Sequence, residues 1–145
     1  MELRRTGFLG FSSRDVALIA VFSTVVTICV ALTSTPLAAS TGGLVPVPVW
    51  AGLFWQMGGV FMRAIIGKRF TNLVSGLVEG VVGSFTIPIG VFGLIALPAQ
   101  ALVLEVVFGL TGDRVKNMGW AVLGGALSSA LFTYLVAGIF FHVKK

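Results

Sequence analysis

The sequence predicts an all-α membrane protein: a polytopic bundle of transmembrane helices with its N-terminus in the cytoplasm. Of the 145 residues, 57% are hydrophobic and only 10% are charged, and the mean hydropathy is +1.04. A soluble domain carries about 25% charged residues, so this chain has too few charges to cover a polar surface. Its apolar content equally excludes a disordered chain. The remaining class is one integral membrane domain in the cell membrane.

Charged residues divide the apolar sequence into segments long enough to cross a membrane. A helix needs about 20 residues to span the hydrocarbon core. The segments between the charge clusters fit five crossings, at about 16–34, 44–64, 70–87, 90–111 and 118–141. A sixth, short or re-entrant element within residues 36–48 is the alternative.

The basic clusters determine the predicted topology. The N-terminal cluster and those within 63–69 and 113–116 are separated by even numbers of crossings, so all three can lie in the cytoplasm. The turns at 33–48 and 84–98 carry no charge and are predicted to face outward, close to all five prolines. Five crossings leave Lys144 and Lys145 outside, against the positive-inside rule.

The first apolar segment is predicted to be a retained helix rather than a cleaved signal peptide. Its apolar run, residues 16–32, exceeds the 7–15 residues of a typical signal core. The preceding Ser12-Ser13-Arg14-Asp15 is typical of a capping box at a helix N-terminus.

Small residues are predicted to bring the helices into close contact. Gly76 and Gly80 form one small-xxx-small pair, and Gly124 and Ser128 form another. The first helix presents a further small-residue face, either to its neighbours in the bundle or to a partner subunit, formed by Ala20, Thr24 and Thr27.

Three predicted spans each place a polar side chain near the middle of the membrane. These are Gln56, Glu79 and Gln100, and Glu105 follows roughly 7–8 Å closer to the cytoplasm. A carboxylate at the bilayer centre costs at least about 2.5 kcal/mol, so such groups face the bundle interior, pair, or contact a ligand. Gln100 and Glu105 cannot share one helix face, because five residues rotate the helix by about 140°.

A flat heteroaromatic ligand is one explanation of this polar patch. Amide and carboxylate groups could hydrogen-bond to the edge of its ring, and Trp50 or Trp55 could stack on its face. Hydrogen bonding between helices, with no ligand, is the alternative.

Motifs of enzymes and metal sites are absent from the sequence. It has no Walker-type, HExxH or GxSxG motif, and it has one cysteine and one histidine. We therefore expect no catalytic residues, no metal and no cofactor, and any ATP must be hydrolysed by another polypeptide. The net charge of +5 is attributed to membrane topology rather than to a nucleic-acid partner.

Several segments resemble the substrate-binding S components of energy-coupling factor (ECF) transporters. Residues 11–22 are similar to the start of their first helix, and residues 100–108 resemble a Gln…Glu…Phe signature of the hydroxymethylpyrimidine type. The helix ending at Lys68 and Glu79 in the next helix are also similar. The resemblance covers roughly residues 11–125.

This resemblance implies a helical bundle that captures a vitamin, or a vitamin precursor related to thiamine, from outside. It also implies partners: a coupling membrane subunit, which small residues of the first helix contact, and two ATPases. The sequence departs from the family in two ways. S components typically have six helices, and their Ala-xxx-Ala pattern is missing here, where Ala17 and Ala20 are three residues apart.

The leading hypothesis is a substrate-binding subunit in which Gln56, Glu79 and Gln100 hydrogen-bond the ligand. The alternatives are a stand-alone secondary carrier or channel, and a structural subunit without a ligand. A carrier commonly pairs its buried carboxylate with an intramembrane cation, whereas Arg63 is predicted at a cytoplasmic helix end. The ligand itself is not identified by the sequence.

Overall fold

The structure is a computed structural model that describes residues 10–40, 47–87, 90–112 and 117–142. Side chains are described in these ranges except at 35, 38, 47–50 and 136–142. This part of the chain is helical and contains no strand, which confirms the predicted all-α fold. Its α-helices are α1 (Ser13–Ser40), α2 (Val47–Ile66), α3 (Thr71–Thr86), α4 (Gly93–Leu110) and α5 (Met118–His142), with a 3-10 turn, η2 (Gly90–Phe92), before α4.

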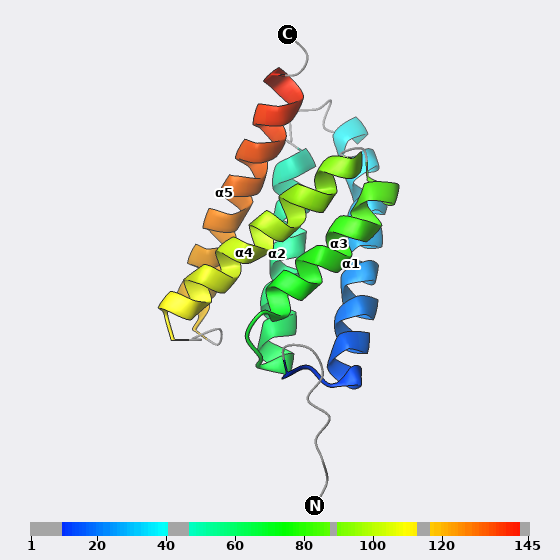
Figure 1. Cartoon of the computed structure of the whole chain (residues 1–145). Coiled ribbons are helices and arrows are strands. Elements are labelled where there is room, and N and C mark those ends of the chain that lie inside the picture. The colour runs from blue at the N-terminus through cyan, green and yellow to red at the C-terminus, as the bar shows by residue number, and fades with distance from the viewer. Residues whose placement is uncertain (1–9, 41–46, 88–89, 113–116, 143–145) are drawn as a thin grey trace, which may run out of the picture.

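The helices form a bundle whose members pack as a closed ring (Figure 1). Helix α1 contacts α2 and α3, α3 contacts α4, α4 contacts α5, and α5 returns to α2. Helix α3 also contacts α2 across the ring. Side chains on the inner faces of α2, α4 and α5 therefore meet one another although they are far apart in the sequence.

Helix lengths and composition agree with a multi-pass membrane protein. Three helical segments are long and apolar enough to cross a bilayer, and α2 contributes a shorter apolar helix, Ala51–Ile66. The three segments are Ser13–Ser34, Gly90–Leu110 and Met118–Leu135. Helix α1 continues beyond the predicted end of its span at residue 34 and runs through Pro36 to Ser40.

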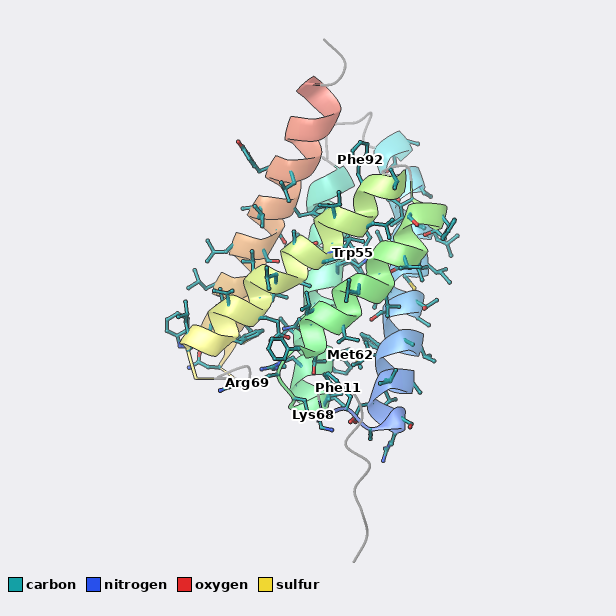
Figure 2. All side chains as sticks on the ribbon, in the orientation of Figure 1. Phe11, Trp55, Met62, Lys68, Arg69 and Phe92 are labelled. Carbon is teal, nitrogen blue, oxygen red and sulfur yellow. The ribbon has the colours of Figure 1, made fainter. Side chains whose placement is uncertain are left out.

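One end of the bundle carries the basic side chains that the structure describes. Lys68 and Arg69 lie together at the end from which the chain starts (Figure 2). The predicted capping box is confirmed there: the Ser12 amide donates to Asp15 Oδ2 at 2.8 Å, and the Asp15 amide donates to Ser12 Oγ at 3.2 Å. Lys68 Nζ pairs with Asp15 Oδ2 at 2.7 Å and so ties the α2–α3 turn to α1. By the positive-inside rule we expect this end to face the cytoplasm.

Close contact between α3 and α4 depends on the predicted glycine pair. A Cβ at Gly76 would lie 2.5 Å from Ala101 Cβ and 3.0 Å from the Leu97 carbonyl oxygen. A Cβ at Gly80 would lie 3.0 Å from the Gly93 carbonyl oxygen. Real Cβ atoms essentially never show a 2.5 Å separation, and 3.0 Å is tighter than nearly all of their contacts. The absence of a Cβ at both positions therefore allows the two helices to approach one another closely.

We expect Gly76→Ala to destabilise the bundle by about 1–3 kcal/mol, because the added methyl group overpacks the α3–α4 contact. Gly109→Ala is the matched control, since a Cβ at Gly109 on α4 would meet no atom within 4 Å. Thermal unfolding in detergent measures both variants. Equal melting temperatures for Gly76→Ala and the wild type would contradict this account of the contact.

Candidate functional site

A polar cluster lies at the junction of α2, α4 and α5, in the half of the bundle away from the basic end. Gln100 is 1% exposed, and its Nε2 donates to the Gly52 carbonyl oxygen at 3.3 Å. Ser128 Oγ donates to the Gln100 backbone carbonyl at 2.6 Å, whereas the buried Ser129 Oγ has no hydrogen-bond partner. We call these four residues, Gly52, Gln100, Ser128 and Ser129, the junction cluster.

Gly52 lies where side chains of α4 and α5 converge on α2. A Cβ at this position would lie 3.5 Å from each of Gln100 Nε2, Ser129 Oγ and Phe132 Cδ1. The three helices therefore converge on one backbone position, and the Gly52 carbonyl is accessible to the glutamine.

Trp55 links the junction cluster to α1. Its indole Nε1 donates to Thr27 Oγ1 at 3.4 Å, and its ring meets Phe132 edge-on with centroids 5.4 Å apart. The Trp55 side chain is buried, so in this structure both faces of the ring are covered by protein. Trp50 lies one turn earlier in α2, and its side chain is outside the described residues.

Glu79 lies in a second group of polar side chains, between α3 and α1. Ser75 Oγ donates to Glu79 Oε1 at 3.0 Å and is itself 2.6 Å from Ser23 Oγ. Among the described residues, no cation pairs with Glu79 and no hydrogen bond joins it to Gln56 or Gln100. The structure thus buries all three predicted midplane residues, but on two sides of the bundle.

Gln56 follows Gly52 by one turn of α2 and borders the gap between α2 and α5. It is 4% exposed, and its Oε1 is buried without a hydrogen-bond partner. A Cβ at Gly125 of α5 would lie 3.8 Å from Gln56 Cβ. Gln56 therefore faces α5 close to Gly125, a position without a side chain.

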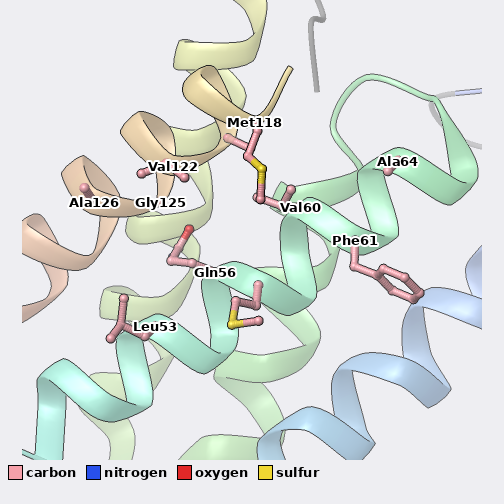
Figure 3. A pocket seen from close by; sticks show the side chains of 11 residues that line it. Leu53, Gln56, Val60, Phe61, Ala64, Met118, Val122, Gly125 and Ala126 are labelled. Carbon is pink, nitrogen blue, oxygen red and sulfur yellow. The ribbon is translucent and has the colours of Figure 1, made fainter. Parts of the chain in front are cut away.

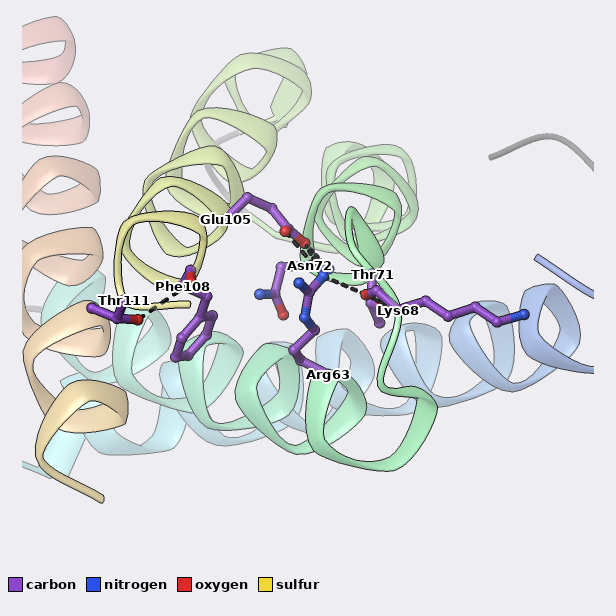
Figure 4. A network of polar contacts seen from close by, with 7 residues as sticks. All are labelled: Arg63, Lys68, Thr71, Asn72, Glu105, Phe108 and Thr111. Carbon is purple, nitrogen blue, oxygen red and sulfur yellow. Dashed lines mark hydrogen bonds and ion pairs between the residues drawn. The ribbon is translucent and has the colours of Figure 1, made fainter. Parts of the chain in front are cut away.

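Glu105 belongs to a buried ion pair near the cytoplasmic end (Figure 4). Its Oε2 is 3.1 Å from Arg63 of α2, and its Oε1 accepts from the Asn72 backbone amide of α3 at 2.8 Å. Arg63 also donates to the Lys68 carbonyl oxygen. The two charged side chains are 2% and 8% exposed. As predicted, Glu105 and Gln100 leave α4 on different faces.

The sequence analysis missed Arg63 as the partner of Glu105. Arg63 lies in the last turn of α2, as the sequence predicts, but the sequence did not match it with the carboxylate at the same depth. Each residue lies about one turn before the C-terminal end of its helix, and α2 and α4 run in the same direction. This shared depth could have indicated that Arg63 and Glu105 form a pair. Asn72 was also missed: its side-chain Oδ1 and Nδ2 are buried without partners.

The predicted small-residue face of α1 is partly used within the chain. Thr27 is buried and bonded to the Ser23 carbonyl at 2.8 Å as well as to Trp55. Ala20 and Thr24 remain half-exposed, and Thr24 Oγ1 donates to the Ala20 carbonyl at 2.7 Å. A partner could therefore reach Ala20 and Thr24 but not the Thr27 side chain.

A family of transporter components matches most of the chain. The family is described as the permease component of an ABC-type cobalt transport system, and the match spans residues 14–131. The chain belongs to this family. No curated protein and no solved structure matched the chain significantly.

Family membership establishes the setting in which this protein works. It is a multi-pass component of the cell membrane in an ABC-type transport system, whose ATPase and other subunits are its partners. A permease component moves or binds a solute rather than catalysing a reaction. In the part of the chain that the structure describes, no three His, Cys, Asp or Glu side chains gather as a metal site.

We expect Arg63→Met alone to destabilise the protein by about 3–5 kcal/mol, because it leaves the Glu105 carboxylate buried without its cation. The double variant Arg63→Met/Glu105→Leu should recover most of this loss, since it removes both charges. Thermal unfolding of the single and double variants measures the effect. A double variant no more stable than Arg63→Met would show that the pair is not the source of the stability.

Proposed function

We propose that this chain is the substrate-binding subunit of an ECF-type ABC uptake system for a vitamin or vitamin precursor. The ligand class to test first is a thiamine-related pyrimidine. In this proposal Gln100 and Glu79 hydrogen-bond the ligand. Trp50 supplies an aromatic face, because both faces of the Trp55 ring are covered by protein. The family membership and the resemblance to S components both support a membrane subunit that leaves ATP hydrolysis to other chains.

The observation that carries the proposal is the unmet hydrogen-bonding capacity of the junction cluster. Among the described residues, Ser129 Oγ is buried with no partner, and the Gln100 side chain makes one long bond of 3.3 Å. A buried hydroxyl or amide without a good partner costs about 1–3 kcal/mol. A ligand with donors and acceptors on its edge recovers this free energy on binding.

The place of the junction cluster supports capture from outside. Gly52 lies in the first turns of α2, and Gln100 in the first half of α4. Both helices start at the end of the bundle opposite Lys68 and Arg69 (Figures 1 and 2). A ligand arriving from outside would meet Gln100 before it met the Arg63–Glu105 pair, which lies beyond Gln100 toward the cytoplasm.

Glu79 is the second ligand residue in this proposal. It lies between α3 and α1, so it reaches a ligand bound at Gln100 only after the helices shift on binding. Its carboxyl group is buried, and Ser75 is its hydrogen-bond donor among the described residues. Burying a carboxyl group between helices in a bilayer costs free energy unless a hydrogen bond or a charged partner compensates for it. An amino or hydroxyl substituent of a heterocycle is a suitable donor for its second oxygen.

We expect Glu79→Ala and Gln100→Ala each to weaken binding of hydroxymethylpyrimidine about tenfold or more, because each removes a hydrogen bond to the ligand. Calorimetric titration of the purified protein in nanodiscs measures the affinity. Thr24→Ala is the control, since Thr24 donates only to its own helix backbone and its loss should leave the affinity unchanged.

The same titration separates this proposal from its competitors. Wild-type affinity in both variants would overturn the assigned ligand residues. Binding of Co²⁺ but of no heterocycle would replace the vitamin with a cation as substrate. Uptake into liposomes by the chain alone, without ATPase subunits, would instead identify a secondary carrier.

A further inference from the structure

A groove runs along the seam between α2 and α5, from the level of Gln56 toward the cytoplasmic end (Figure 3). It encloses about 550 Å³. Its α2 wall carries Met57 and Phe61, which are 70% and 54% exposed, and its α5 wall begins with Met118, which is 81% exposed. Small residues complete the α5 wall: Ala121, Gly125 and Ala126.

Gln56 is the polar residue that lines this groove, and its amide is unsatisfied. The Gln56 side chain points toward α5 near Val122 and Gly125 (Figure 3). Its Oε1 is buried and has no hydrogen-bond partner among the described residues. An amide carries one acceptor and two donors, so the Gln56 side chain can hydrogen-bond to a polar group that enters the groove.

Lipid does not satisfy such a site. Acyl chains fill apolar space but offer neither donors nor acceptors, and an unsatisfied polar group in hydrocarbon costs several kcal/mol. A neighbouring transmembrane helix can supply both, because Ser, Thr, Asn and Gln side chains hydrogen-bond across helix contacts. The occupant that fits an apolar groove with one amide is therefore a helix with a polar side chain.

The walls of the groove suit a helix. Ala121, Gly125 and Ala126 allow another backbone to approach α5 closely, as small residues do at helix contacts in membranes. Met57 and Met118 are unbranched and flexible, so they adapt to the side chains of a partner. The groove is a different surface from the half-exposed Ala20 and Thr24 of α1, which the sequence analysis offered to a partner.

We infer that the α2–α5 groove is the docking site for a transmembrane helix of another subunit of the same transporter. A polar side chain of that helix hydrogen-bonds the Gln56 amide. The inference rests on the membership of the chain in a family of ABC transport components, and not on the identity of the ligand. It gives Gln56 a role in assembly, in place of the ligand contact that the sequence predicted.

Filling the groove tests the inference. In Gly125→Leu, the new side chain occupies the space beside Gln56, while its Cβ makes an ordinary contact of 3.8 Å with Gln56 Cβ. Gly109→Leu is the matched control, because Gly109 is exposed on α4 with no atom within 4 Å of an added Cβ. The chain is co-expressed with the other membrane subunit and the ATPases of its transporter, and native mass spectrometry measures the assembled fraction.

We expect Gly125→Leu to lower assembly at least tenfold and Gly109→Leu to leave it unchanged. Assembly of Gly125→Leu at the wild-type level would overturn the inference. Loss of bound hydroxymethylpyrimidine from Gly125→Leu, with assembly intact, would show that the groove holds a small molecule instead. In either case the binding data of the wild type still test the proposed function separately.

A second variant keeps the test decisive if Gly125→Leu fails to fold. Gln56→Leu removes the unsatisfied amide, so the isolated subunit should melt at the same temperature as the wild type or higher. Its association with the partner subunit should weaken about threefold to tenfold, because one hydrogen bond between helices is lost. Unchanged association in Gln56→Leu would also overturn the inference.

Discussion

The interior of a bilayer contains no water that could hydrogen-bond to a polar side chain. Every polar side chain in the hydrocarbon must find its partner in the protein or in something that the protein binds. Most of this chain obeys the constraint internally. Threonine hydroxyls of α1 donate hydrogen bonds to carbonyls of their own helix. Ser23 is hydrogen-bonded to Ser75, and Arg63 forms an ion pair with Glu105.

A few buried polar side chains are exceptions to this rule. Ser129, Gln56 and Asn72 keep buried polar atoms without partners. Ser129 lies beside Gln100 toward the outer end of the bundle, where a solute from outside would arrive. Gln56 lies on a groove that is open between two helices, where another subunit can dock. Unpaired buried polar atoms are thus the common basis of the two proposals, a ligand at Ser129 and another subunit at Gln56.

The ion pair of Arg63 and Glu105 complements this arrangement at the cytoplasmic end. It joins α2 to α4, and the Asn72 amide adds α3 to the same carboxylate. These contacts hold three helices together where the chain offers few other charged groups in the membrane. The polar groups nearer the outer end are therefore carried on a bundle whose cytoplasmic end is fixed.

Much of the fold could be predicted from the sequence, because hydropathy and the positions of charges are one-dimensional signals. The five apolar segments, the capping box at Ser12 and the close approach at Gly76 all follow from local residue patterns. The rotation of each helix did not follow from them. The three polar residues Gln56, Glu79 and Gln100 lie at a similar depth. They point in different directions because each helix is rotated differently about its own axis: Glu79 faces α1, and Gln56 faces the α5 groove.

The partners of buried charges depend on the same rotations. Glu105 was treated as a candidate ligand residue because its depth was known but its direction was not. Pairing it with Arg63 required the positions of α2 and α4 relative to one another, which a single sequence specifies only through packing.

Native mass spectrometry of the protein released from its own membrane tests the central claim most directly. We predict a complex that contains this chain, a second membrane subunit and ATPase subunits, and a small organic mass that stays with this chain when the complex is dissociated. A homo-oligomer of this chain, with no other subunit and no bound organic molecule, would contradict the account.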